Sequence, residues 1–148
     1  MTRPQPPIRR VTFDELDPLT AYSLWRLRQQ VFVVEQASPY PDLDGRDTEP
    51  STVHFLAEAG GELVGCLRLL DDGDAARIGR VVVAAHARGH GLADVLMRAA
   101  MAEVGDRRAR LDAQVGLAGW YAGYGFEISG PEYVEDGIPH LPMERPGS

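Results

Sequence analysis

Arg77-Ile-Gly-Arg-Val-Val-Val83 leads, through a short Ala-Ala-His-Ala turn, into Arg88-Gly-His-Gly-Leu-Ala93. The first segment has the apolar, β-branched character of a buried strand, and the second is a glycine-rich entry into a helix. Such a junction directs free backbone N–H groups and a helix N-terminus at one spot, which favours a phosphate group. Gly89 and Gly91 allow close approach of a ligand because neither carries a Cβ. These segments predict a protein that holds a phosphorylated cofactor.

Length and composition predict one globular domain spanning 1–148, with 1–7 as a loose Pro-rich arm. The chain is 44% hydrophobic and 25% charged, as is usual for ordered soluble domains. It contains no apolar run of the roughly 20 residues that a membrane span needs, and its N-terminus lacks the apolar core of a signal peptide. Cys66 is the single cysteine, so a disulfide framework is excluded and a cytoplasmic location is expected.

The charged residues exclude several function classes. A net charge of −7 argues against nucleic-acid binding, which needs a basic face. All 15 basic residues are arginine. Without a lysine the chain cannot be a P-loop enzyme, a pyridoxal enzyme or a protein kinase, because each of these relies on a lysine side chain.

Helix and strand signals alternate along the chain. Helices are expected over 17–36, 92–104 and 117–124, the first beginning with an Asp17-Pro18 cap. Residues 37–52 have the composition of a loop. Strands are expected over 9–13, 53–58, 63–70, 77–83, 110–115, 126–133 and 140–144. This order predicts an α/β fold with a mixed, mostly antiparallel central sheet flanked by helices.

Two motifs connect this order to a known family. The element order, with Arg88-x-x-Gly91-x-Ala93 after the central strand, resembles the GNAT superfamily of acyl-CoA N-acyltransferases. Tyr121-Ala-Gly-Tyr-Gly125-Phe126 is similar to the family's Tyr-x-x-x-Gly-Phe ending. The phrases Arg28-Gln-Gln-Val-Phe-Val-Val-Glu-Gln36 and Glu135-Asp-Gly-Ile-Pro-His140 resemble the ElaA subgroup. The resemblance covers residues 14–145 and implies transfer of an acetyl group from acetyl-CoA to a primary amine, with no metal.

The resemblance also implies how the donor binds. The N–H groups of 88–93 and the following helix would receive the pyrophosphate of acetyl-CoA, with Arg88 adding charge. The strand before the motif would splay from its neighbour, so that pantetheine pairs with the edge of 81–83. An N–H of Val82 or Val83 could polarise the thioester carbonyl. The implied cofactor-binding residues are Val81, Val82, Val83, Arg88, Gly89, His90, Gly91, Leu92, Ala93 and Gln114.

The same resemblance implies a tyrosine as general acid. Tyr121 matches the family position for protonating the departing thiolate, and Tyr124 is the local competitor on the same helix. A base must accept a proton from the amine, and three residues remain open for this role: Glu35, His140 and His54. Alternatively, each of these side chains makes only structural contacts.

The acceptor is expected to be a small or peptide-borne amine. Two acidic segments, Asp42-Leu-Asp44-Gly-Arg-Asp47-Thr-Glu49 and Glu132 to Asp136, would flank the acceptor side in this fold and attract a cation. The alternative is that these carboxylates only solvate the surface.

Other features are weaker. His86 and His90 lie four residues apart but lack further ligands at metal-binding spacing. Cys66 sits in an interior strand, which favours direct transfer through a ternary complex over an acyl-cysteine route. The alternative function is a non-catalytic acyl-CoA-binding sensor. An acyl-homoserine-lactone synthase shares the Arg28 to Phe32 phrase but normally has a longer chain. A homodimer is compatible with the family.

Overall fold

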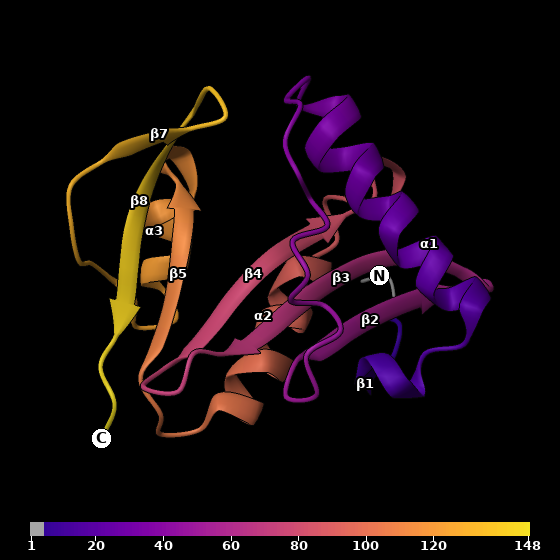
Figure 1. Ribbon diagram of the computed structural model, residues 1–148, viewed down its shortest axis with the longest axis horizontal. Helices are drawn as coiled ribbons and strands as arrows, with labels where there is room; N and C mark the ends of the chain where they lie inside the picture. The colour runs from indigo at the N-terminus through magenta and orange to yellow at the C-terminus, as the bar shows by residue number, and fades with distance from the viewer. Residues whose placement is uncertain (1–4) are drawn as a thin grey trace.

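A computed structural model describes residues 5–148, so part of the arm expected at 1–7 lies outside the described residues. Eight strands form one sheet with helices on both faces (Figure 1), in the order β1-β2-β3-β4-β5-β8-β6, and β7 pairs with β8. All pairs are antiparallel except β4 with β5, which confirms the predicted fold class. The strands are β1 Ile8–Val11, β2 Val53–Ala59, β3 Glu62–Asp71, β4 Ala76–Val83, β5 Ala109–Gln114, β6 Glu127–Ile128, β7 Tyr133–Glu135 and β8 Ile138–Arg145.

The main helices begin and end near the predicted residues. Helix α1 spans Pro18–Arg28 and continues as a π-helical segment, Gln29–Glu35. Asp17 caps α1 by accepting the Thr20 N–H at 2.8 Å, which confirms the expected cap. Helices α2 and α3 span Leu92–Val104 and Ala118–Ala122. No helix within residues 5–148 is long and apolar enough to cross a membrane.

Core packing fixes the position of α2 against the sheet. Helix α2 buries Leu96, Met97 and Ala100 on one face of the sheet, while α1 packs on the other. A Cβ on Gly65 of β3 would lie 3.2 Å from the side chains of Leu92 and Leu96. The glycine therefore permits the close approach that holds the first turn of α2 beside β4.

The sheet opens between β4 and β5. These strands pair only at Ala76–Ala109 and Arg77–Arg110 and then diverge (Figure 1). The register of β3 with β4 shifts between Cys66 and Arg68, and Arg80 takes a φ of +52°. This irregularity bends β4 away from its neighbour. The expected splay is confirmed.

The single strand predicted over 126–133 is wrong. The segment instead forms β6 and β7, which pair with separate parts of β8 because Gly130 and Pro131 interrupt the ladder between them. The loop predicted between the last strands shrinks to Asp136 and Gly137, with φ values of +52° and +80°. Positive φ at both central residues gives a tight hairpin turn.

Candidate active site

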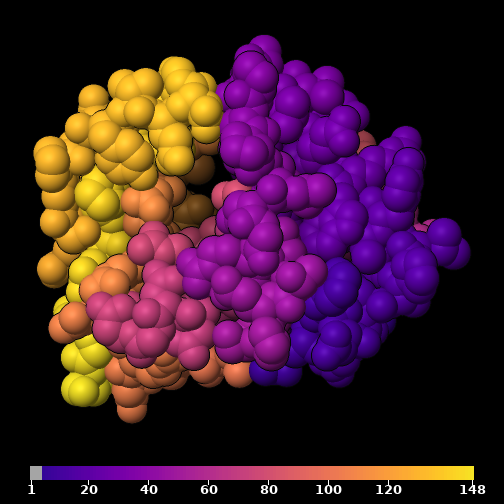
Figure 2. Space-filling model, viewed as in Figure 1, coloured from indigo at the N-terminus to yellow at the C-terminus, as the bar shows by residue number. Residues whose placement is uncertain are grey.

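A pocket of about 450 Å³ occupies the opening between β4 and β5. Figure 2 shows the hollow between the C-terminal strands and the segment before β2. One wall comes from β3, β4 and the loop before β2, and the other comes from β5, β7, β8 and α3. Tyr121, Gln114 and His140 all line this pocket, so three residues from separate sequence segments meet there.

Tyr121 lies deep in the pocket wall and is only 8% exposed. Its ring packs edge-on against Trp120 and Phe126. Burial raises the pKa of its hydroxyl to about 12. Among the residues that the structure describes, no group hydrogen-bonds to this hydroxyl, so it remains a protonated donor at neutral pH.

Tyr124 has a structural partner instead. Its hydroxyl donates to the Asp94 carboxylate on α2, and burial together with that hydrogen bond raises its pKa. Tyr124 does not line the pocket. Of the two tyrosines on this short helix, Tyr121 therefore lines the pocket, whereas Tyr124 is bonded to α2.

His140 stands on the wall opposite β4. Its ring stacks on Tyr133, with centroids 5.7 Å apart and planes at 21°. Its Nδ1 lies 2.8 Å from the Ile138 carbonyl oxygen, which can only accept, so Nδ1 carries the proton. In the neutral ring, Nε2 then holds the free lone pair.

Tyr133 is itself held across the sheet. Burial and the neighbouring Asp112 carboxylate of β5 raise the pKa of its hydroxyl. Arg77 of β4 donates to the same carboxylate at 3.0 Å. This chain of contacts crosses the opening where the two strands part and orients the stacked His140 ring.

Glu35 does not join this group. Arg88 holds it with two hydrogen bonds of 2.7 and 2.9 Å, and the bond from Arg88 lowers its pKa. Glu35 lines a separate pocket of about 490 Å³ beside α1. In this arrangement it is the ionised partner of Arg88 and is not placed to serve as the base beside Tyr121.

His54 is also structural here. It is almost fully buried, packs against Trp25, and its Nε2 lies 3.1 Å from the Asp47 carbonyl oxygen. Burial lowers its pKa, so it stays neutral. It does not line the pocket.

The glycine-rich turn presents backbone donors. Gly89 and Gly91 have φ values of +84° and +79°, and Gly91 caps α2 with no side chain bonding its first turn. Arg88 donates through Nε to the Val83 carbonyl oxygen at 3.0 Å. This turn can receive an anion through its N–H groups.

The acidic loop before β2 has a different role from the one expected. Asp42, Asp44 and Asp47 do not form an open acidic surface, because arginines bind each of them. Arg28 binds Asp42 at 2.9 Å and Asp47 at 2.7 Å. The group, called the arginine–aspartate network below, consists of Arg28, Arg68, Arg80, Asp42, Asp44 and Asp47.

The remaining members connect this loop to the strands. Arg68 of β3 binds Asp44 at 2.8 Å and Asp47 at 3.2 Å, and Arg80 of β4 lies 2.9 Å from Asp42. Glu49 pairs with Arg46. Sequence patterns gave no sign of this network, since its members lie far apart in the chain and the loop residues have the composition of a solvated turn.

The thiol and the imidazoles offer no other site in the described residues. Burial raises the pKa of the Cys66 thiol to about 12, so no thiolate forms. His86 faces Glu62 at the surface. Within residues 5–148, no group of three His, Cys, Asp or Glu side chains is arranged to hold a metal ion.

Comparison with known proteins decides the family. A family model described as an acetyltransferase (GNAT) domain matches residues 16–146. The chain belongs to the GNAT family. This GNAT protein is 49% identical to a UPF0039 protein of Mycobacterium tuberculosis over 146 residues, 95% of this chain and 94% of the relative. It is 38% identical to Protein ElaA of Escherichia coli over 138 residues, 88% and 90% of the two chains.

Solved structures agree with this family. An acyl-CoA N-acyltransferase from Pseudomonas aeruginosa superposes with a TM-score of 0.88 at 39% identity, over 94% of this chain and 98% of that one. The crystal structure of Escherichia coli ElaA gives 0.88 at 36%, with the same coverage. The resemblance found in the sequence is confirmed: this is a GNAT-type acyl-CoA N-acyltransferase, close to ElaA.

Proposed function

We propose that this GNAT protein transfers an acetyl group from acetyl-CoA directly to a primary amine within a ternary complex. One observation supports this most: Tyr121 and His140 line one pocket, and both offer the groups that transfer requires. Tyr121 has an unpaired hydroxyl among residues 5–148, and His140 has a fixed tautomer with Nε2 available. The pocket opens beside the strand edge where the donor is expected.

The donor is expected along β4 and the turn that follows it. The N–H groups of residues 88–93 would bind the pyrophosphate, with about half a unit charge from the α2 dipole. The pantetheine amides would pair with the edge of β4 at 81–83, where β5 has diverged, and Gln114 would face the arm from β5. An N–H of Val82 or Val83 would stabilise the tetrahedral oxyanion.

The two side chains divide the proton chemistry. His140 Nε2 accepts a proton from the acceptor ammonium, and the freed amine attacks the thioester carbonyl. As the C–S bond breaks, the Tyr121 hydroxyl donates to the departing sulfur. A thiol has an ordinary pKa near ~8.5, well below the Tyr121 pKa of about 12, so hydrogen-bond donation during cleavage is the larger part of this action. Glu135 and Asp136 attract the cation to the pocket.

The test is thiol release from acetyl-CoA across a panel of primary amines, for wild type and Tyr121→Phe. Loss of a general acid should lower kcat about 100-fold, with acetyl-CoA affinity unchanged by calorimetry. Tyr124→Phe is the matched control, since it removes a hydroxyl from the same helix outside the pocket, and should stay within about threefold. His140→Gln should also remove the low-pH limb of the kcat/KM profile. Equal loss in both tyrosine variants, or amine-independent release, would refute the proposal.

A further inference from the structure

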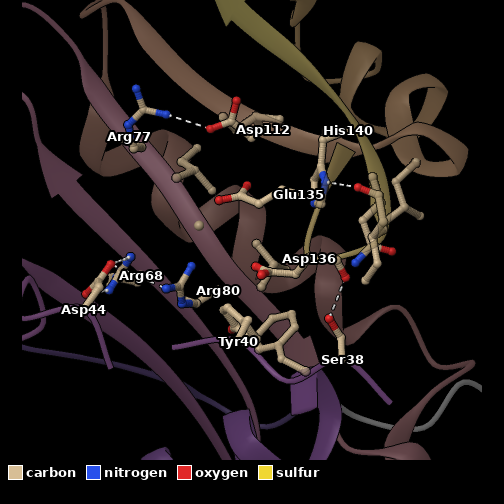
Figure 3. Close-up of a pocket in the computed structure, with 18 of the residues that line it drawn as sticks. Ser38, Tyr40, Asp44, Arg68, Arg77, Arg80, Asp112, Glu135, Asp136 and His140 are labelled. Carbon is tan, nitrogen blue, oxygen red and sulfur yellow. Dashed lines mark hydrogen bonds and ion pairs between the residues drawn. The ribbon is translucent and has the colours of Figure 1, made fainter. Parts of the chain in front are cut away.

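Arg80 is held in an unusual conformation at the floor of the pocket. It is a non-glycine residue with a φ of +52°, and such residues cluster at functional sites because the surroundings must enforce the conformation. The register shift of β3 against β4 lies beside it. Arg80 lines the pocket, and Figure 3 shows its side chain directed from β4 toward Asp44 and Arg68.

The arginine–aspartate network fixes the Arg80 guanidinium but leaves one of its N–H groups without a partner among residues 5–148. Nη2 donates to the Asp42 carbonyl oxygen at 3.1 Å and to Asp44 at 3.4 Å. Nε lies 2.9 Å from an Asp42 oxygen but without hydrogen-bond geometry. The Tyr40 ring supports the group, 5.4 Å from its centroid. Among residues 5–148, nothing hydrogen-bonds to Nη1, which is left as a fixed donor.

The pocket floor beside Arg80 is kept open. Gly79 precedes Arg80 and lines the pocket, and an added Cβ there would meet no atom within 4 Å. Its φ is not in the left-handed region, so the backbone conformation does not require glycine. The missing side chain instead leaves room for a ligand group against β4.

The opposite wall carries two acidic side chains. Glu135 and Asp136 reach into the same pocket from the β7–β8 turn (Figure 3), and no arginine in the described part of the chain pairs with either carboxylate. His140 lies beside them on β8. The pocket is therefore bipolar, with guanidinium donors on β4 and free carboxylates near the proposed base.

We propose that the acceptor is a primary amine that also carries a carboxylate. Arg80 binds the carboxylate through Nη1, while the amine end lies against Glu135, Asp136 and His140. Because Arg28, Arg68 and Arg80 are balanced by three aspartates, recognition depends on oriented N–H donors and not on net positive charge. This inference rests on the proposed function of the same pocket and names its substrate class.

The experiment compares straight-chain ω-amino acids of increasing length with alkylamines and diamines of the same length. Thiol release from acetyl-CoA gives kcat/KM for each. At one chain length or more, the amino acid should exceed the matched alkylamine by at least tenfold, since charge-assisted hydrogen bonds discriminate at that level. Arg80→Gln should raise the KM for the amino acids, so that their kcat/KM comes within threefold of that of the matched alkylamines. Arg80→Lys should restore part of the preference for amino acids. Gly79→Leu, which fills the floor, should also raise the KM for the amino acids.

Arg98→Gln is the matched control, since Arg98 is 76% exposed and pairs with Asp94 on its own helix; it should leave the ratio unchanged. If alkylamines or diamines are preferred at every length, or Arg80→Gln leaves the ratio intact, the inference is wrong while the transferase proposal stands. If no amine releases thiol, the proposed function fails instead. Calorimetry of the same amino acids against CoA-loaded protein then decides the inference: binding lost in Arg80→Gln supports it, and absence of binding overturns it.

Discussion

The two walls of the pocket are stabilised by different interactions. On the β4 side, the arginine–aspartate network buries charges deeply: Arg28 is 1% exposed and is bonded to two aspartates. On the other side, the β7–β8 hairpin is an edge structure whose Val134 is 68% exposed. Hydrogen bonds that join the walls include those of Ser38 to the Asp136 carbonyl oxygen at 2.9 Å, Arg77 to Asp112 at 3.0 Å and Gln114 to Gln36 at 3.4 Å.

The contrast shows how one pocket can be both fixed and adaptable. A buried ion-pair network adds little net stability, but it is costly to break and so specifies one arrangement of the loop before β2. The hairpin has few buried contacts, and such regions open most easily. Arg80, the proposed carboxylate-binding residue, therefore stands on the fixed β4 wall, while His140, Glu135 and Asp136, proposed to contact the amine, stand on the less buried hairpin wall.

Breaking the fixed wall should have the largest effect. Asp47→Ala removes a carboxylate that binds both Arg28 and Arg68, so each of these buried guanidinium groups loses one of its two carboxylate partners. The free energy of unfolding should fall by about 3–5 kcal/mol, measured by urea denaturation.

Glu49→Ala is the matched control for that loss. Glu49 is in the same loop but pairs with Arg46 near the surface, and exposed pairs contribute less than about 1 kcal/mol. Similar losses in the two variants would show that the network does not hold this wall.

Lowering the pH should have the second-largest effect, a loss of stability in the fixed β4 wall. Burial opposes ionisation of Asp44, but hydrogen bonds from Arg68 and from the Arg46 N–H prevail and lower its pKa to about 2. A folded-state pKa below the unfolded value of 3.8 means that this stabilisation is complete above about pH 4 and is lost as pH falls toward 2. Because its side chain is 29% exposed, the loss should be about 1–2 kcal/mol. Urea midpoints between pH 5 and pH 2 should fall less steeply in Asp44→Asn.

Loosening the wall formed by the β7–β8 hairpin should have a smaller effect on stability. Ser38→Ala removes the hydrogen bond to the Asp136 carbonyl oxygen, which should cost about 0.5–1.5 kcal/mol. Hydrogen exchange of the amides in 133–138 should accelerate by several fold while α2 amides are unaffected. Uniform acceleration over the whole chain would mean that the hairpin does not open independently.

The smallest effect is expected outside both walls. Glu35 and Arg88 are each 42% exposed, so Glu35→Gln should change stability by less than about 1 kcal/mol. Because Glu35 lies outside the pocket of Tyr121, kcat should stay within about threefold. A 100-fold loss of kcat would restore Glu35 as the base.

Local signals in the sequence were sufficient for most of the fold. The Asp17-Pro18 cap, the apolar period of α2 and the glycines after β4 each depend on neighbours in the chain, and each was predicted correctly. The split of 126–133 was missed because Gly130 and Pro131 were outweighed by the apolar and aromatic residues around them.

The site was predictable only where a motif carried it. The 88–93 turn was predicted from its glycines, Tyr121 came from the family resemblance, and His140 was one of three candidates for the base. The choice among them depends on contacts between distant segments, such as Arg88 with Glu35 and Tyr133 with His140. The φ of Arg80 likewise arises from the register of β3 and β4, which single-residue preferences do not encode.

Strands β4 and β5 pair at two positions and then separate. Beyond that point, the inner edges of the two strands have no strand between them. A pantetheine arm seated there would supply the missing backbone, so the cofactor would act as a temporary strand that joins two half-sheets. Binding of acyl-CoA would then stabilise the folded protein and link the unfolding of the two half-sheets. At 100 times its dissociation constant, such a ligand adds about 2.7 kcal/mol to the free energy of unfolding. With acyl-CoA bound, the two halves should unfold together as one unit.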